Sequence, residues 1–544
     1  MTVKPDAYTI RSFVEDLKRK HPEQIIEIED DVSIDYEPTA YYLSLRKRNP
    51  VLVFKNLVGF KNFSIVTNIF GSEERLAMLS GLSSIREVIE KWSGIANGIP
   101  TENLVFNNQR DSFRALTSDK DLNLFNLPIP SHFEMDGSRR GFSRYITSGL
   151  TTTIDPENED VINLSFARIQ PFEKKKFAFD AGSRGHLWKY LNISKERRER
   201  MKMTILVGPN PIFYLLAASF IDNEFRKASK ILNVEFSRGH KNDIPIPTDT
   251  EIAIEAEFLP GETFEEGPFA EYAGYMGYDS TKFVAEVKSI LIKRDPIYYD
   301  IQPSNSSEHV NLFSIPRSSI VMKSILAALP KVSDYQVVWP HYGGRFISFG
   351  YVVNPEPGLA KQLGISILGH DPLWNKVVFV NEGQTELTME ASLVNLAQSS
   401  EFSEKEIARV SNSYIISSDP TRDESGNSGK IVFVTRGRSP KIKREVRDDH
   451  VIISTGNGNV LITHKEVMEE QKVNVVVSDD IDITDEEQIG WAIATRLNPD
   501  KDIKIERNKI TFLARRKVPS VAHVPENVKE KIEKRVTSLS GRFH

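Results

Sequence analysis

The spacing of apolar residues changes twice along the chain. Behind Thr9, apolar residues have helical spacing, and a strand-like run follows at 25–28. Strand patterns separated by turns dominate from about 125 to 310, whereas helices and strands alternate again from 317 onward, as in βαβ units. We therefore expect a mixed α/β (α+β) multidomain chain, with an N-terminal α/β domain over 1–120, a central β-rich domain over 121–315 and a C-terminal α/β domain over 316–544.

One strand of the central stretch has a clear pattern. Ile252, Ile254, Ala256 and Phe258 alternate with glutamates, which predicts a strand buried on one face and solvated on the other. No internal repeat at a fixed period is found.

Composition excludes several classes of protein. The 544 residues are 40% hydrophobic and 27% charged, with a formal charge of −5, which argues against a collagen-like, mainly disordered or broadly nucleic-acid-binding chain. The absence of cysteine removes disulfides, thiolate metal sites and cysteine nucleophiles. The charged N-terminus is unlike a secretory signal, and Gly208 and two prolines break the most apolar window, 203–221. We expect a cytoplasmic protein with no membrane span and no nucleic-acid partner.

An acidic turn near the middle of the chain is the most informative segment for chemistry. It reads EEGPFAEYAGYMG over 265–277, and Gly267-Pro268 prevents a regular helix there. Glu266 and Glu271 are therefore carried on a turn, from which two carboxylates can approach one site and divide acid and base roles. A solvated acidic loop is the alternative, because runs of charge commonly have no other role.

Three further polar segments could contribute to a site. NLSFAR at 163–168 alternates as a strand, with Asn163 and Ser165 on one face and Arg168, a permanent cation, on the other. His186 follows in GHLWK, and Glu224 begins a predicted helix after AASF at 217–220. Each also has an ordinary structural interpretation: an ion pair, a hydrogen-bonded histidine and a helix-dipole contact, respectively.

Taken together, these segments resemble the UbiD family of prenylated-FMN-dependent decarboxylases. EGPFAEYAGYMG is similar to the family's closing motif, with Ala270 where glycine is usual, and NLSFAR and GHLWK resemble its Asn-x-x-x-x-Arg element and the following His segment. The segments VLVFKNLVGF, LPIPSHFEMDG and RYITSGLTTTIDPE also read like successive family segments, and VVVSDDIDITDEEQIGWAIATRLNPDKD resembles an aspartate-rich strand and helix near the C-terminus. The resemblance covers most of 10–375 and 470–505, and it implies a split-β-barrel flavin-binding centre.

The resemblance also implies a set of cofactor ligands. Asn163, His186 and Glu224 resemble the ligands of a divalent metal, Mn²⁺ or Mg²⁺, that bridges the cofactor phosphate to the protein, and oxygen and imidazole donors suit such an ion. Peptide oxygens around 217–220 resemble the family's K⁺ site. The implied prenylated-FMN contacts are Asn163, Ser165, Arg168, His186, Ala218, Ser219, Glu224 and Lys465. The contact to the phosphate stays open between His464-Lys465 and His370.

Catalytic roles follow from the same resemblance. Arg168, Glu266 and Glu271 match the network beside the reactive rings of the flavin, which draws electrons from an aromatic or α,β-unsaturated carboxylic acid as CO₂ leaves. Glu271 is then the acid that protonates the product carbon, and Phe269, Tyr272 and Tyr275 could line an apolar pocket around it. The family also implies a flavin prenyltransferase as cofactor supplier, and a homodimer or higher homo-oligomer formed through the C-terminal domain.

The chain departs from the family over 380–465. A lysine-led strand begins at Lys376, yet the better match to the aspartate-rich strand begins at Lys472, so either an insertion or a local duplication is present. Two other functions stay open: a non-catalytic subunit or scaffold of a larger assembly, and a site that runs toward carboxylation. The segment 300–309 resembles a variable loop near the substrate, although a solvated turn would have the same composition.

Overall fold

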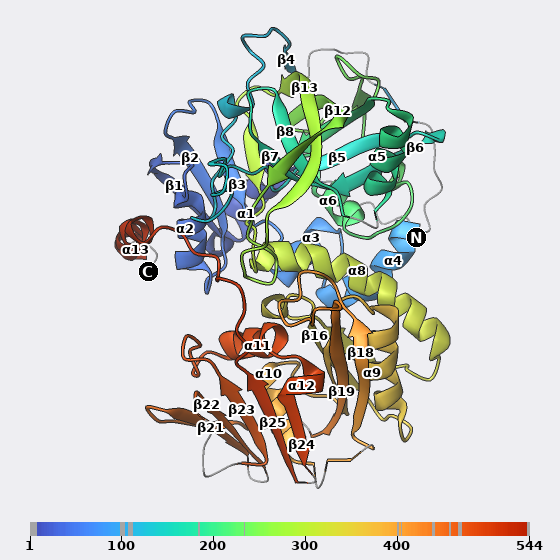
Figure 1. Cartoon of the computed structure of the whole chain (residues 1–544), viewed down its shortest axis with the longest axis vertical. Helices are drawn as coiled ribbons and strands as arrows, with labels where there is room; N and C mark the ends of the chain where they lie inside the picture. Colours follow the sequence, from blue (N-terminus) through green and yellow to red (C-terminus); the bar gives the residue numbers. More distant parts are fainter. Residues whose placement is uncertain are drawn as a thin grey trace. The chain divides into compact units, whose positions relative to one another are not determined.

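The computed structural model of the chain describes residues 8–97, 104–106, 113–182, 185–232, 234–399, 402–403, 405–437, 441–455, 458–465, 471–506 and 508–540. The chain divides into two compact units, Met1–Arg317 with Val521–His544 and Ser318–Ser520 (Figure 1). The boundary between them falls within one long helix, α8 (Ser307–Ala328). The three-domain division at 120 and 315 stays a prediction.

The first unit opens with a small four-stranded sheet of order β1-β2-β3-β14. Its elements are α1 (Ile10–Lys20), β1 (Ile25–Val32), α2 (Glu37–Leu45), β2 (Val51–Leu57), β3 (Ser64–Thr67), α3 (Glu73–Leu79), α4 (Ile85–Asn97) and β14 (Ile297–Asp300). The helix predicted behind Thr9 is confirmed, because the Thr9 hydroxyl accepts the Ser12 N–H and the Ser12 side chain caps Thr9 in return. Strand β14 lies parallel to β3, so residues from the central stretch complete the N-terminal sheet.

An eight-stranded sheet forms the centre of the first unit and carries the candidate site (Figure 1). Its main path is β6-β5-β9-β12-β13-β8-β7, and β4 pairs with β13. The bounds are β4 (Arg114–Leu116), β5 (Leu150–Asp155), β6 (Asn158–Phe166), β7 (Arg168–Pro171), β8 (Lys176–Asp180), β9 (Met201–Val207), β12 (Ile252–Glu266) and β13 (Ser280–Ile292). All of its pairings are antiparallel, so the predicted β-rich centre is confirmed, while its split-barrel form stays a prediction.

The prediction that β12 is half-buried is wrong at its first residues. Glu255, expected on a solvated face, is fully buried and accepts the backbone N–H groups of Lys241 and Asn242. Glu251, just before β12, is buried as well and accepts two hydrogen bonds from Arg11 on α1. Tertiary partners thus satisfy carboxylates that the alternation alone would leave in water.

Helices and short strands connect the central strands. They are α5 (His186–Arg197), α6 (Pro211–Ala217), α7 (Glu224–Leu232), β10 (Phe236–Ser237) and β11 (Ile246–Pro247). Asn210 caps α6 through the Ile212 N–H, and Pro211 fills the first turn of the helix, where no N–H is needed. The turn between α6 and α7 holds Phe220 and Asn223 at positive φ.

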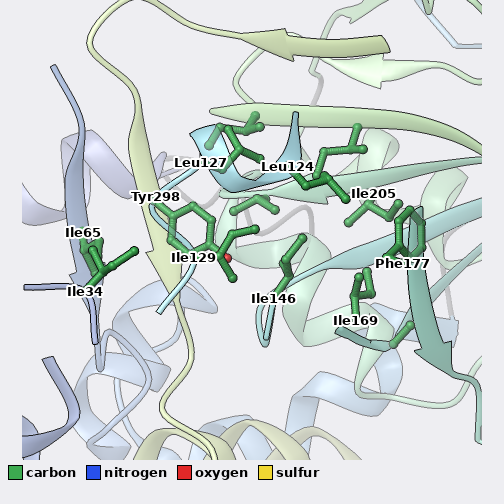
Figure 2. Close-up of a cluster of buried hydrophobic side chains, with 14 of the residues drawn as sticks. Ile34, Ile65, Leu124, Leu127, Ile129, Ile146, Ile169, Phe177, Ile205 and Tyr298 are labelled. Atoms are coloured by element: carbon green, nitrogen blue, oxygen red, sulfur yellow. The ribbon is translucent and has the colours of Figure 1, made fainter. Parts of the chain in front are cut away.

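The core of the first unit is made of aliphatic and aromatic side chains from its sheets and the loops between them (Figure 2). The fully buried members labelled there include Ile65 of β3, Tyr298 of β14, Ile169 of β7 and Ile205 of β9. Burying one such side chain contributes about 1.5–3 kcal/mol, so this cluster fixes the strands from which the site side chains project.

The second unit contains the same sheet topology twice. Its five-stranded sheet has the order β15-β16-β17-β19-β18, and its six-stranded sheet has the order β20-β21-β22-β23-β25-β24. In each sheet three parallel strands are central, with antiparallel neighbours on both sides. The bounds are β15 (Tyr335–Val338), β16 (Ile347–Val352), α9 (Leu359–His370), β17 (Val377–Glu382), α10 (Met389–Ala397), β18 (Ile407–Tyr414), β19 (Asn427–Arg436), β20 (Lys443–Val446), β21 (His450–Thr455), β22 (Gly458–Thr463), β23 (Val473–Val477), α11 (Glu486–Thr495), α12 (Pro499–Asp502), β24 (Ile503–Glu506) and β25 (Lys509–Ala514).

This topology favours a local duplication over a simple insertion for the atypical segment 380–465. Lys376 directly precedes β17 and Lys472 directly precedes β23, the corresponding central strands of the two sheets. The repeat was not found in the sequence because the connections differ in length: α9 lies between β16 and β17, whereas only residues 464–472 separate β22 from β23.

The C-terminal segment of the chain belongs to the first unit. Helix α13 (Glu526–Ser540) packs on α2, where Ile532 is fully buried and Lys531 forms an ion pair with Glu37 (Figure 1). Just before this helix, Ala522 N–H donates to Gly274 O and Glu134 N–H donates to His523 O. Within the described ranges, no helix combines the length and the apolar character that a bilayer crossing requires.

Candidate active site

Arg168 joins two glutamates that lie 98 and 103 residues further along the chain. Its Nη2 donates to Glu266 Oε2 at 2.7 Å and its Nη1 donates to Glu271 Oε1 at 3.0 Å. Asp180, which pairs with Arg168 across β7 and β8, places Oδ2 3.6 Å from Nη2. The structure thus brings together the three residues predicted to be catalytic, and it adds a third carboxylate that the sequence did not indicate.

A short hairpin presents the two glutamates. Glu266 is the last residue of β12, and Gly267, at φ 107°, turns the chain out of the strand. The Glu271 N–H then donates to Tyr275 O, and the Gly277 N–H donates to Phe269 O. We call residues 267–277 the catalytic hairpin.

The two glutamates differ in their access to solvent. The Glu266 side chain is 0% exposed and that of Glu271 is 32% exposed, while Arg168 between them is 15% exposed. The alternative of a solvated acidic loop is therefore wrong for this pair. A buried carboxylate and a half-buried one on the same guanidinium are chemically distinct, which suits different roles in one reaction.

Electrostatic forces keep Arg168 charged. Burial alone would lower its pKa, but the charges of Glu266, Glu271 and Asp180 outweigh burial and raise the pKa well above the usual value. The guanidinium carbon lies 4.9 Å from the centre of the Phe269 ring, and that ring packs on Tyr145 at 4.4 Å. Burial, followed by the charge of Glu266, raises the pKa of the Tyr145 phenol as well.

A second polar cluster contains the predicted metal ligands Asn163 and Glu224. Asn163 on β6 is buried, its Nδ2 donates to Ser165 Oγ, and its Oδ1 has no hydrogen-bond partner among the described residues. Glu224, the first residue of α7, is buried too and accepts the Leu164 N–H at 3.4 Å, next to Asn163. Burial raises the pKa of this carboxyl to about 8. A buried amide oxygen beside a buried carboxyl, for which no ion pair is found among the described residues, fits a site for a divalent metal.

His186, the third predicted ligand, borders this cluster at the start of α5. Its side chain is 44% exposed, and Nε2 lies 3.5 Å from Oδ1 of Asp222. Its ring stacks on Tyr190, whose pKa is raised mainly by burial, then by Asp155, and further by the charge of Glu224. Among the described residues, no group of three or more His, Asp or Glu side chains is arranged to hold a metal, but the predicted set contains an amide in place of one of them.

Two threonines that the sequence did not indicate extend the cluster. Thr151 and Thr153 on β5 lie directly opposite Ser165 and Asn163 on β6, so all four side chains share one face of the sheet. Both hydroxyls are buried, and within the part of the chain that the structure describes neither has a hydrogen-bond partner. This face therefore presents polar atoms in excess of what the protein itself satisfies, as expected where a polar ligand group binds.

The remaining predicted contacts have weaker support. The Ser219 hydroxyl is hydrogen-bonded within the protein: it donates to Leu215 O and accepts from Trp92. A ligand at Ala218 and Ser219 would therefore be bound by their peptide groups. Lys465 lies in the second unit after β22, where its own N–H donates to Thr463, and its role as a phosphate contact stays a prediction. His370 lies at the end of α9, and its Nδ1 lies 2.9 Å from Ser366 O.

A series of aromatic contacts joins the catalytic hairpin to α8 and to the turn between α6 and α7. Tyr272 stacks on Phe313 of α8 at 5.7 Å, and Phe313 packs edge-on against Phe220 in the turn between α6 and α7. Phe220 is exposed, and the guanidinium of Arg317 lies over its ring. In the neighbouring segment 300–309, Gln302 and Ser306 are buried and hydrogen-bonded within the protein, so this segment is not a solvated turn.

Comparison with known proteins places these residues in a family. Three family models match the chain: the 3-octaprenyl-4-hydroxybenzoate carboxy-lyase N-terminal domain at 16–92, its Rift-related domain at 106–306 and its C-terminal domain at 458–517. The chain belongs to the UbiD family. The assignment predicted from sequence, a UbiD-like carboxy-lyase, is confirmed, and every predicted catalytic and metal-binding residue lies within the Rift-related match.

Relatives that match over most of their own length support this assignment. A phenolic acid decarboxylase of Sedimentibacter hydroxybenzoicus is 24% identical over 393 residues, which cover 68% of this chain and 79% of the relative. An anhydromevalonate phosphate decarboxylase of Methanosarcina mazei is 26% identical over 320 residues, which cover 58% and 70%. Both relatives are decarboxylases, but they differ in the acid that they act on.

Solved structures share the fold. The UbiD-class enzyme HmfF from Pelotomaculum thermopropionicum, in complex with FMN, superposes with a TM-score of 0.70 at 21% identity, over 79% of this chain and 94% of the other. The apo 3,4-dihydroxybenzoic acid decarboxylase of Klebsiella pneumoniae gives 0.70 at 19% identity, with the same coverage. The predicted fold class, a mixed α/β multidomain chain, is confirmed.

Proposed function

We propose that this carboxy-lyase is a prenylated-FMN-dependent, reversible, non-oxidative decarboxylase of an aromatic or α,β-unsaturated carboxylic acid. The observation that carries the proposal is the pairing of Arg168 with both Glu266 and Glu271, one buried and one half-buried. A non-catalytic subunit would have no need to hold two acids on one buried guanidinium. Binding of FMN or prenylated FMN by structural relatives supports the choice of cofactor.

Glu271 is the proton donor in this proposal. Its Oε1 accepts from Arg168, which leaves Oε2 to carry the proton that is transferred to the carbon from which CO₂ departs. Bound prenylated FMN would supply the electron sink for the pair released when the carbon–carboxyl bond breaks. Glu266 accepts from Arg168 and fixes the guanidinium, and Phe269 beneath it excludes water.

Asn163, Glu224 and His186 would hold Mn²⁺ or Mg²⁺ at the phosphate end of the cofactor. The unpartnered Oδ1 of Asn163 and the buried Glu224 carboxyl support this assignment. His186 would turn from Asp222 to complete the set. Ser165, Thr151 opposite it and Thr153 opposite Asn163 would contact the phosphate, and peptide oxygens at Ala218 and Ser219 would hold K⁺.

The ring pair of Tyr272 and Phe313 favours a planar substrate. Tyr272 and Phe313 offer stacked rings beside the catalytic hairpin, which suits an aromatic acid better than a flexible aliphatic one. Carboxylation would use the same residues in reverse at high CO₂. A flavin prenyltransferase as supplier, a cytoplasmic location and a homo-oligomeric state complete the proposal, and they rest on the family resemblance.

The test is native mass spectrometry with absorbance and metal analysis, on protein made with and without a co-expressed flavin prenyltransferase. We expect a species of prenylated-FMN mass and about one Mn per chain, and CO₂ release from members of an aromatic-acid panel. Glu271→Gln should keep the cofactor and lose turnover, whereas His186→Ala should lose metal and cofactor together. Wild-type turnover by Glu271→Gln would refute the acid assignment, and protein that stays colourless and metal-free in both preparations would refute the cofactor.

A further inference from the structure

A buried carboxyl that the proposed reaction does not use lies behind the catalytic hairpin. Asp136, in the loop between Phe133 and Phe142, is 0% exposed. Its Oδ1 accepts the N–H of Ala270 at 3.0 Å, and its Oδ2 accepts the N–H of Phe133 at 3.0 Å. Each oxygen thus holds one backbone donor, one on its own loop and one on the catalytic hairpin.

The neighbouring residue makes the same connection. The Gly137 N–H donates to Pro268 O at 2.8 Å. Gly137 has φ +60°, and a side chain there would place Cβ 2.0 Å from Phe142 O, so only glycine lets the loop between Phe133 and Phe142 close on itself in this way. Asp136 and Gly137 therefore hold Pro268 and Ala270, the residues on either side of Phe269.

The contacts of Asp136 and Gly137 fix the backbone beside the residues that are proposed to be catalytic. Phe269 lies under Arg168, and Glu271 directly follows Ala270. A shift of the Ala270 peptide would move the Glu271 carboxyl relative to Arg168, and a displacement of about 1 Å can lower a rate on the order of 100-fold.

We propose that Asp136 is a positioning residue that sets the place of Glu271 by holding the Ala270 N–H with its carboxylate. The inference rests on the proposed role of Glu271 as the acid, and it adds the residue that keeps this acid in register with Arg168.

An ionised carboxylate suits this role better than a neutral group. Two N–H donors require two acceptor oxygens, and an amide at the same position offers one oxygen and one competing donor. Burial raises the pKa of Asp136 to about 7. Above that pH the ionised carboxylate therefore accepts both N–H groups, and below it the hydrogen bond to the catalytic hairpin weakens. The titratable or charged groups that face Asp136 are His132, Arg168, Tyr145 and Tyr36.

The experiment compares Asp136→Asn with wild type in two readouts, on cofactor-loaded protein. In hydrogen exchange at pH 8, we expect the amides of 268–277 to exchange about tenfold faster in the variant. In steady-state kinetics, kcat should fall on the order of 10- to 100-fold, with cofactor content retained. The decline of wild-type kcat/KM below about pH 7 should be absent from the variant, because the amide does not titrate.

Glu255→Gln is the matched control. Glu255 is also fully buried and also accepts backbone N–H groups, from Lys241 and Asn242, but it lies outside the site. This variant should lose stability yet keep the exchange of 268–277, kcat and the pH profile of wild type. A merely structural Asp136 would behave in the same way as this control.

Three outcomes decide the inference. Wild-type exchange, kcat and pH profile in Asp136→Asn would overturn it. If the variant does not fold, the inference is tested on wild type alone, by hydrogen exchange of 268–277 corrected for intrinsic exchange rates. The protection of these amides must then be lower at pH 6 than at pH 8. Protection that stays constant between the two pH values overturns the inference. If no acid is decarboxylated by wild type, the proposed function fails, whereas accelerated exchange in the variant would still support the Asp136 contact.

Discussion

At the scale of single residues, the site depends on one guanidinium that serves two carboxylates. Lysine carries a single ammonium without the planar fork, so it cannot reproduce both hydrogen bonds of Arg168. Arg168→Lys should leave one glutamate poorly paired and lower kcat on the order of 100-fold or more, with a loss of about 1–3 kcal/mol in the free energy of unfolding. Turnover of loaded enzyme and urea denaturation measure the two effects.

An exposed ion pair provides the control for this substitution. Arg436 pairs with Glu382 but is 60% exposed, and pairs of this kind contribute about 0–1 kcal/mol. Arg436→Lys should leave turnover and stability unchanged. Equal losses in both variants would mean that the effect of Arg168→Lys is a general one and does not arise at the site.

Buried carboxyls also make stability depend on pH. Burial raises the pKa of Glu308 to about 7 from 4.5, so the folded state holds its proton more tightly than the unfolded state does. The contribution is therefore greatest below pH 4.5 and is lost as pH rises through 7. Between pH 5 and pH 8 wild type should lose about 2–3 kcal/mol more stability than Glu308→Gln does. Parallel pH profiles of the two proteins in urea denaturation would contradict this assignment.

The site residues that were predicted from the sequence differ from those that were missed in how far their function depends on contacts with distant parts of the chain. Arg168, Glu266 and Glu271 stand in short motifs whose residue types already indicate chemistry. Asp136 stands in LPIPSHFEMDG, a segment that resembles the family but whose residue types by themselves indicate no chemistry, and its proposed role arises from an N–H 134 residues away. Thr151 and Thr153 became visible only through the register of β5 on β6, which aligns them with Ser165 and Asn163. Long-range pairing, rather than residue type, carries this information.

At the scale of elements, local signals located most helices and strands, but not how they combine. The cap at Thr9 and the proline at the start of α6 fixed where those helices begin. The two related sheets of the second unit remained hidden, because connections of unequal length abolish a fixed period while they preserve the strand order. The sequence Gly456-Asn457-Gly458-Asn459 is typical of a hairpin turn, and β21 and β22 on either side of it pair antiparallel, although Gly456 and Asn457 themselves lie outside the described residues.

Helix α13 gives a prediction at this scale. Its Ile532 is fully buried against the first unit, and truncation of such a side chain costs about 2–5 kcal/mol. Ile532→Ala should lower the free energy of unfolding of the first unit by that amount, whereas Lys534→Ala on the exposed face should change it by less than about 0.5 kcal/mol. Because Ala522, just before α13, donates to Gly274 of the catalytic hairpin, faster hydrogen exchange at 267–277 should accompany the loss. Equal effects of the two variants would show that α13 does not dock through Ile532.

At the scale of the whole molecule, the two units have separate cores. The cluster that contains Ile169 and Ile205 belongs entirely to the first unit, whereas Phe379, Phe433 and Phe512 pack together within the second. Separate cores favour separate unfolding events. Calorimetry should therefore resolve two transitions, and Phe433→Ala should lower only the one that belongs to the second unit, by about 3–5 kcal/mol.

The shift of each unfolding transition on cofactor binding should then show which unit binds the cofactor. Prenylated FMN with Mn²⁺ at about 100 times its Kd should stabilise the unit that binds it by about 2.7 kcal/mol. If Asn163, His186 and Glu224 supply the main contacts, only the transition of the first unit should rise. If Lys465 contacts the phosphate, the second transition should rise as well, and Lys465→Ala should abolish that second shift while it leaves the first in place. A single transition that Phe433→Ala lowers as a whole would contradict the independence of the two cores.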